Sequence, residues 1–339
     1  MEKKDLRIIF MGTPEFAVGT LSRLVEDGYN VVAVVTQPDK PVGRHQEHLQ
    51  PSEVKRYALE HEIPVLQPVK MKDPDFVEQL ASYKADLQVV VAFRMLPEVI
   101  WAMPRMGTFN VHAALLPQYR GAAPINWAII NGETETGVTT FFLDKDIDTG
   151  RIILQKPFSI PEDANVEYVY NGLMKLGADI AVETIDLVLE GNGTVKTTEQ
   201  SEWLGKEQLE TLHTAPKIFK ETCQINWAQE AHHVHNFVRG LSPYPGSWTT
   251  LYAIDGEKTE GSVLKIFKTV LSNKPVNAEK VGTIRVENRH LYVATANNWI
   301  EIAELQLAGK KRMTACDFLN GNKNIENCCV KFYHIVLSP

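Results

Sequence analysis

The stretch LRIIFMGTPEFAVGTLSRLVEDGYNVVAVVT, residues 6–36, decides the fold of the N-terminal part of the chain. Its two ends, LRIIFM and NVVAVVT, are continuous apolar runs of the kind found in strands that are buried on both faces. Between them, Thr13 is a predicted N-cap and Pro14 suits the first position of a helix. We therefore predict a helix over Phe16–Glu26 that stops at Gly28, and with it a strand–helix–strand unit.

The same alternation continues outward to about residue 190. Predicted helices separate further apolar runs, and the runs are a short one around Val65, then ADLQVVVAF (85–93), GTFNVH (107–112) and GVTTFFL (137–143). Such a pattern predicts an α/β fold: a Rossmann-like domain with a mostly parallel sheet covered on both faces. The first turn, FMGTPEF, has one glycine where a dinucleotide site needs GxGxxG, so we expect no NAD.

A second domain is predicted beyond a polar stretch. Five short strand-like runs bounded by Gly, Asn and Asp favour a small OB-like β-barrel, and they read SWTTLYAI, SVLKIFKTV, VGTIRV, HLYVAT and WIEIAELQL. We assign residues 1–190 to a catalytic domain, 191–215 to a linker and 216–339 to the C-terminal domain.

Composition and charge narrow the class of protein. A hydrophobic content of 44% and a charged content of 23% are those of a soluble globular protein. No run approaches the ~20 apolar residues of a membrane span. Glu2 and Asp5 precede the first strand, which argues against a targeting peptide. Four cysteines without a CxxC pair indicate reduced thiols, and so we expect a cytoplasmic protein.

The net charge of −7 is unevenly distributed. Residues 1–205 carry 19 Lys+Arg against 29 Asp+Glu, whereas residues 206–339 carry 16 against 13. A basic C-terminal part is a weak indication of a polyanionic partner.

Three polar side chains form a candidate catalytic site. Asn110 and His112 are spaced by two on an apolar strand and therefore point to the same face. Asp148, in the segment DKDIDTG, follows the neighbouring strand, and ligands bind at the carboxyl ends of strands in open α/β sheets. A carboxylate there would hold His112 in its charged form, and the three groups suit oxyanion stabilisation and proton movement in acyl transfer. The alternatives are a buried structural histidine and a solvated acidic turn.

Direct transfer is favoured over a covalent intermediate, because no Ser, Cys or Lys stands in an obvious nucleophile turn. His112 and Asp148 are also metal-type ligands, but no third ligand stands at a conventional spacing, so we predict no metal.

A long loop after the second strand is the other functional candidate. The segment from Thr36 to Lys55 contains three prolines and has Arg44 near its middle. Loops of this length inside compact domains are usually functional or disordered, and an arginine on such a loop suits phosphate. A plain surface loop is the alternative.

These segments together resemble a known family. NVH followed by ALLPQYRGAAPI, and then ETGVTTFFLDKDIDTG, resembles the folate-dependent formyltransferases. TQPDKPVGR and RGLSPYPGSWT resemble the members of that family that act on charged initiator tRNA. The resemblance extends from Ile8 to Gly321.

The resemblance implies a reaction and a set of site residues. A formyl group would pass from 10-formyltetrahydrofolate to the α-amino group of methionine on initiator tRNA. Asn110, His112 and Asp148 would be catalytic, and Arg44 would contact the acceptor stem of the tRNA. The folate would lie along two segments, whose members are Ala114, Leu115, Leu116 and Pro117 in one and Phe93, Arg94, Met95 and Leu96 in the other.

The sequence also departs from the family pattern. Ala114 replaces a serine, Arg94 stands where the family has glycine, and the lysines that often follow the loop arginine are His45, Gln46 and Glu47. We expect a monomer that does not bind a membrane. The alternative functions are a sugar-nucleotide formyltransferase, a 10-formyltetrahydrofolate hydrolase and a nucleic-acid-binding protein without enzyme activity.

Overall fold

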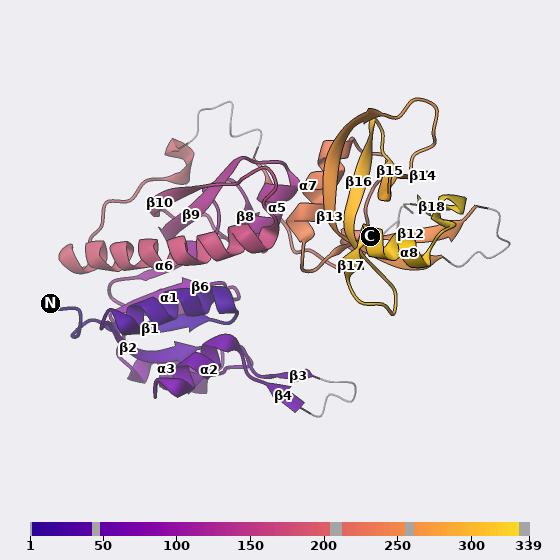
Figure 1. Ribbon diagram of the computed structural model, residues 1–339. Helices are drawn as coiled ribbons and strands as arrows, with labels where there is room; N and C mark the ends of the chain where they lie inside the picture. Colours follow the sequence, from indigo (N-terminus) through magenta and orange to yellow (C-terminus); the bar gives the residue numbers. More distant parts are fainter. Residues whose placement is uncertain (1, 43–47, 204–211, 255–260, 332–339) are drawn as a thin grey trace. The chain divides into compact units, whose positions relative to one another are not determined.

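The computed structural model describes residues 2–42, 48–203, 212–254 and 261–331. By their contacts they form two compact units, which are described separately (Figure 1). The first unit is Met1–Pro124, Glu135–Ser159 and Tyr170–Thr214; the second is Ile125–Thr134, Ile160–Val169 and Ala215–Pro339. The units interleave along the sequence, whereas the predicted bounds at 190 and 216 are contiguous; those bounds stay a prediction.

A seven-stranded sheet forms the first unit, in the order β10-β9-β7-β6-β1-β2-β5. The five strands from β7 to β5 run parallel, which confirms the predicted Rossmann-like, mostly parallel architecture. The strands are β1 (Arg7–Gly12), β2 (Asn30–Val35), β5 (Val65–Leu66), β6 (Leu87–Val91), β7 (Thr108–His112), β9 (Glu135–Phe142) and β10 (Ile152–Ser159).

The direction of β9 corrects one step of the sequence argument. β9 is antiparallel to β7, with Phe142 opposite Phe109 near the start of β7 and Thr139 opposite His112. The loop after β9 therefore leaves the sheet at the amino end of β7, not at its carboxyl end as predicted. Strand direction is not encoded in an apolar run, and the connection is long enough for either direction. Asp148 in this loop nonetheless lies beside His112, the last residue of β7.

Helices cover both faces of this sheet. They are α1 (Glu15–Glu26), α2 (Glu53–Glu60), α3 (Pro74–Ser82), α4 (Glu98–Trp101) and, from Tyr170 on, α6 (Val166–Glu190). The helix α5 (Pro124–Ile130) belongs to the second unit from Ile125 on. On one face α3 packs against Ile9, Met11 and Val90. On the other, Phe16 of α1 meets Tyr170 of α6 edge to face at 5.3 Å. None of the described helices is both long and apolar enough to cross a bilayer.

The predicted cap of α1 is wrong. Pro14, not Thr13, occupies the N-cap position, and it offers no side-chain acceptor. The Thr13 hydroxyl is instead buried with no hydrogen-bond partner among the described residues. Pro14 takes an extended conformation, φ −79° and ψ 172°, so the cap lies one residue after the predicted Thr13, and the helix begins at Glu15, one residue before the predicted Phe16.

An antiparallel barrel forms most of the second unit, which confirms the OB-like prediction. Its strands follow the path β14-β15-β16-β13-β12-β18. The bounds are β12 (Ser247–Ala253), β13 (Ser262–Pro275), β14 (Ile284–Glu287), β15 (His290–Ala294), β16 (Asn298–Leu307) and β18 (Cys328–Lys331). A bridge between Thr283 and Cys329 joins the two ends of this path. Gly282 beside it has φ +85°, and a Cβ there would lie 2.1 Å from the Val330 carbonyl oxygen.

Two segments from the N-terminal half belong to this second unit. Asn126 of α5 donates to the carbonyl of Gly240 at 2.8 Å. Gly240 lies in α7 (Ala231–Leu241). From the same helix, the Arg239 Nη1 donates to the carbonyl of Ala164 at 3.0 Å. Within the second unit, α7 is therefore hydrogen-bonded to two segments that lie far upstream of it in the sequence.

Candidate active site

The structure brings His112 and Asp148 together inside the first unit. The His112 Nδ1 lies 3.8 Å from the Asp148 Oδ2, and the two side chains are 6% and 13% exposed. The other ring nitrogen, Nε2, lies 2.9 Å from the carbonyl oxygen of Tyr119. A carbonyl oxygen only accepts, so Nε2 carries a proton. A second proton on Nδ1 would point at the Asp148 carboxylate.

Asn110 stands two residues before His112 on β7, on the same face of the sheet. Its side chain is half-buried, and its amide has no hydrogen-bond partner among the described residues. The amide is therefore available as a donor to a ligand, whereas both nitrogens of His112 face protein oxygens.

The stretch Tyr119–Gly121 orients both partners of this pair. The carbonyl of Tyr119 accepts from His112, and the backbone N–H of Gly121 donates to the Asp148 Oδ2 at 2.9 Å. Tyr119 and Asp148 both have left-handed backbone conformations, at φ +59° and +55°. Non-glycine residues adopt that region rarely and at an energetic cost, and such residues cluster at functional sites.

The first predicted folate segment is held from the neighbouring strands. The Thr139 hydroxyl on β9 donates to the Ala114 carbonyl at 2.6 Å and accepts from the Leu116 N–H at 3.1 Å. From β10, the Gln155 amide donates to the Leu116 carbonyl at 2.7 Å. Ala114, Leu116 and Pro117 are buried, so Leu115, which is half-buried, is the member that exposes side-chain surface.

The second predicted folate segment is held by Arg94. Its guanidinium donates to the carbonyls of Pro68 and Val69 and lies 5.7 Å from the centre of the Phe93 ring. Burial lowers the pKa of Arg94. Met95 is 68% exposed, whereas Leu96 is buried. Arg94, which departs from the family pattern, therefore hydrogen-bonds this segment to the loop that contains Pro68 and Val69.

Sequence reasoning missed Tyr119, Thr139 and Gln155 as supports of the site. Tyr119 acts through its backbone, which leaves no side-chain signature. Thr139 and Gln155 stand in strands that contain several other polar residues, ETGVTTFF and IILQKPFS, so no local signal in the sequence singled them out.

Arg44 lies outside the described residues. The strands that flank it, β3 (Lys40–Val42) and β4 (His48–Gln50), pair antiparallel. At their base Lys55 lies 2.6 Å from Asp39, which also accepts from Gln67 at 2.7 Å. The hydrogen bonds from Lys55 and Gln67 lower the pKa of Asp39. The ends of the predicted tRNA-contacting loop are therefore fixed to the first unit.

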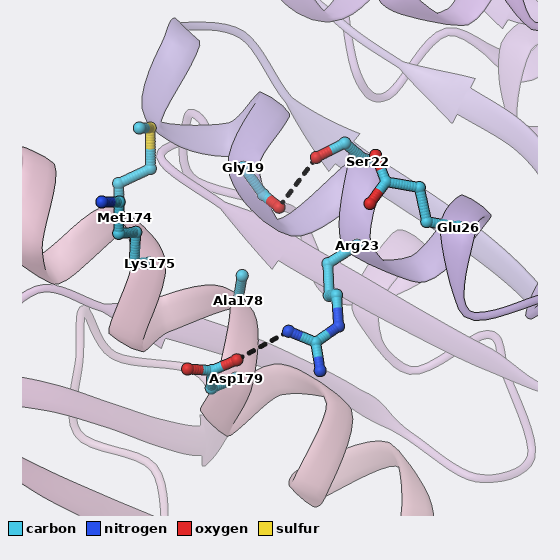
Figure 2. Close-up of a pocket in the computed structure, with 8 residues that line it drawn as sticks. All are labelled: Gly19, Ser22, Arg23, Glu26, Met174, Lys175, Ala178 and Asp179. Atoms are coloured by element: carbon cyan, nitrogen blue, oxygen red, sulfur yellow. Dashed lines mark hydrogen bonds and ion pairs between the residues drawn. The ribbon is translucent and has the colours of Figure 1, made fainter.

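Two other features of the described residues lie apart from the His112–Asp148 pair. A groove of about 420 Å³ between α1 and α6 is lined by Gly19, Ser22, Arg23, Glu26, Met174, Lys175, Ala178 and Asp179, and Arg23 pairs with Asp179 at 2.8 Å (Figure 2). Glu230, His232 and His233 form an exposed group of metal-type ligands at the start of α7. Neither contains a residue of the predicted site.

Comparison with known proteins gives matches over nearly the whole chain. The formyl transferase family model matches residues 6–185, and the model of the formyl transferase C-terminal domain matches residues 217–323. A methionyl-tRNA formyltransferase of Parabacteroides distasonis is 54% identical, over 96% of this chain and 98% of its own length. That of Bacteroides fragilis is 52% identical, over 95% and 96%.

Solved structures share the fold. The crystal structure of an N-formyltransferase from Helicobacter canadensis, in complex with folinic acid and dTDP-3-aminofucose, superposes with a TM-score of 0.62. It is 19% identical and covers 92% of this chain and 100% of its own. At that identity the match concerns the fold alone.

Proposed function

This chain belongs to the formyl transferase family, and from that membership we propose that it transfers a formyl group from 10-formyltetrahydrofolate to the α-amino group of methionine on initiator tRNA. The observation that carries the proposal is the 54% identity to a methionyl-tRNA formyltransferase across nearly the full length of both chains. The pairing of His112 with Asp148 beside Asn110 supports it, because these groups match the chemistry of the reaction.

The reaction starts when the neutral amine attacks the formyl carbon. The new C–N bond places negative charge on the formyl oxygen, and the attacking nitrogen becomes positive. Asn110 donates a hydrogen bond to that oxygen, since its amide is not engaged by any residue that the structure describes. His112 in its protonated form stabilises the same charge; a hydrogen bond from its Nε2–H requires that bond to leave the Tyr119 carbonyl. Such donors act most strongly in a site that excludes water.

The second step moves a proton and breaks the old C–N bond. Asp148 accepts the proton from the ammonium, directly or through a water molecule, and passes that same proton on to the N10 nitrogen of the folate as it departs. Asp148 suits this role because Gly121 holds its Oδ2 in place. Tetrahydrofolate and the formylated amine are the products, so atoms and charge balance without a metal or a redox cofactor.

The folate is proposed to lie along residues 93–96 and 114–117. Support comes from the exposed surface of Met95 and the partly exposed surface of Leu115. Arg44 is proposed to contact the acceptor stem of the tRNA, and the protein is proposed to act as a monomer in the cytoplasm.

One assay tests the function. The protein is incubated with labelled 10-formyltetrahydrofolate and methionyl initiator tRNA, in parallel with a sugar-nucleotide amine and with water as the acceptor. We expect label in the aminoacyl ester, and loss of that label with the His112→Ala variant. Formylation of the sugar nucleotide instead, or folate hydrolysis without tRNA, would assign the chain to one of the two related activities.

A further inference from the structure

A buried glutamine in the predicted linker joins two loops of the active site. Gln200 starts the short 3-10 helix η1 (Gln200–Glu202) and is 4% exposed. Its Nε2 donates to the carbonyl of Asp148 at 2.9 Å and to that of Gly150 at 2.8 Å. Its Oε1 accepts from the Arg120 Nε at 3.1 Å and from the Arg120 Nη2 at 2.6 Å. All four hydrogen-bonding positions of the amide are therefore used.

The segment before Gln200 is fixed to the sheet. Thr198 pairs with Ile152 through two backbone hydrogen bonds of 2.9 Å. Arg151 forms an ion pair with Glu199, and its Nε donates to the Thr197 hydroxyl at 2.7 Å. These contacts fix residues 197–199 beside the start of β10, so the amide of the adjacent Gln200 has a defined direction.

The loops that Gln200 joins are those that set the His112–Asp148 geometry. Asp148 has φ +55° and therefore needs external contacts to hold that conformation. Arg120 lies between Tyr119, whose carbonyl accepts from His112, and Gly121, whose N–H donates to Asp148. One side chain thus fixes the backbone that carries Asp148 and the backbone that orients both catalytic partners.

We propose that Gln200 is a positioning residue for formyl transfer, which acts by holding the Asp148 loop against residues 119–121. This inference rests on the proposed function, because the rate that it affects is that of the proposed reaction. Gln200 hydrogen-bonds to the backbone carbonyl of Asp148 and not to its carboxylate, so it contributes by orientation and not by contact with the reacting atoms.

The test compares Gln200→Ala and Gln200→Glu with a matched control, Gln88→Ala. Gln88 is also buried, at 0% exposure, and accepts from the Thr108 hydroxyl at 3.0 Å, but it contacts neither loop. Gln200→Glu keeps the acceptors for Arg120 and removes the two donors to the loop. We expect both Gln200 variants to lower kcat about 10- to 100-fold, as expected when catalytic groups shift by about 1 Å. Gln88→Ala should lower stability and leave kcat within threefold.

A double substitution separates positioning from a merely structural role. In an Asp148→Asn background, Gln200→Ala should change kcat less than threefold, because the group that it positions is already disabled. If the two effects instead multiply, Gln200 does not act through Asp148 and the proposal is overturned. The proposal is also overturned if Gln200→Ala alone keeps kcat within threefold of wild type.

Amide hydrogen exchange gives a readout that does not depend on activity. Gln200→Ala should speed exchange in residues 144–151 and 119–121 and leave the rest of the first unit unchanged, whereas Gln88→Ala should not. If the wild-type protein formylates no tRNA, the proposed function fails, and exchange alone then decides the positioning role. Unchanged exchange in both loops would refute it whatever the activity.

Discussion

At the scale of single residues, the two ring nitrogens of His112 have separate partners. Nε2 is held by a backbone carbonyl and Nδ1 faces a carboxylate. Both nitrogens therefore face protein oxygens, and neither is open to a substrate in this arrangement. That argues against a free general base, which would need one open nitrogen as an acceptor.

His112→Ala should lower kcat by about 10²- to 10⁴-fold, the range for the loss of an acid–base or oxyanion-stabilising group. The dissociation constant of the folate should change far less, since the folate segments are held by other residues. Steady-state kinetics and a direct binding titration measure the two quantities. A variant that keeps a tenth of the wild-type turnover would remove His112 from the mechanism.

Asp148→Asn keeps the size of the side chain and its acceptor for Gly121, but removes the charge and the proton acceptor. We expect kcat to fall by about 10²-fold or more, with the rest of the fold unchanged because asparagine also tolerates a left-handed backbone. Asp146→Asn, an exposed neighbour in the same loop, is the control and should stay close to wild type. Equal losses in the two variants would mean that general loop charge, not Asp148 itself, is required.

At the scale of elements, the hairpin around the undescribed Arg44 is anchored by Asp39, Lys55 and Gln67. The strands β3 and β4 are thus ordered before any partner binds, which lowers the entropic cost of binding an extended polyanion beside them.

Arg44→Ala should lower kcat/KM for the tRNA by a factor equivalent to about 1–3 kcal/mol, the size of a lost charge-assisted contact. Arg44→Lys should recover part of this, because an ammonium does not grip phosphate with two parallel bonds. Folate affinity, measured in parallel, should be unaffected, since the folate segments follow other strands. If Arg44→Ala keeps kcat/KM for the tRNA within twofold of wild type, or loses folate affinity to the same extent, this loop does not have the proposed tRNA role.

The sequence predicted where the strands lie better than it predicted their directions and the contacts between segments. Six strands of the central sheet were visible as apolar runs, whereas β10 (Ile152–Ser159) was missed because polar residues follow its first three apolar ones. The His112–Asp148 pair was predicted from residue type and order. The direction of β9 was not, because an antiparallel and a parallel strand bury the same face pattern. Gln200 was placed in a linker, since one buried polar side chain among exposed ones leaves no periodic signal. Asn110, His112 and Asp148 were therefore predicted from the chemistry of their side chains. The backbone groups that hold His112 and Asp148 became visible only in the structure.

At the scale of the whole molecule, stability depends on pH through a buried histidine in the second unit. His235 is 6% exposed, and its Nδ1 lies 2.9 Å from the Thr269 hydroxyl. Burial, and then the charge of Arg239, lower the pKa of His235, against the opposing charges of Asp163 and Glu162. The folded chain thus keeps this ring neutral at a pH where the unfolded chain protonates it.

The free energy of unfolding should therefore fall as the pH drops below about 6.5, the unfolded pKa, by up to about 1.4 kcal/mol per pH unit until the folded pKa is reached. Above that pH the contribution is fully present. Urea unfolding at pH 7.5 and 5.5 measures the difference. His233→Gln, at an exposed position of the same helix, should keep the wild-type pH dependence, whereas His235→Gln should reduce it. Equal dependence in all three proteins would assign the effect to other groups.

The interleaving of the two units has a consequence for synthesis on the ribosome. Residues 125–134 and 160–169 emerge first, but the partners with which they form a compact unit begin at Ala215. Translation adds about 5–20 residues per second, so for some seconds the nascent chain carries side chains such as Ile129 and Val169, both fully buried in the finished protein, without their final neighbours. The N-terminal sheet can assemble in that interval, while these two segments remain candidates for a ribosome-associated chaperone until the barrel has been translated.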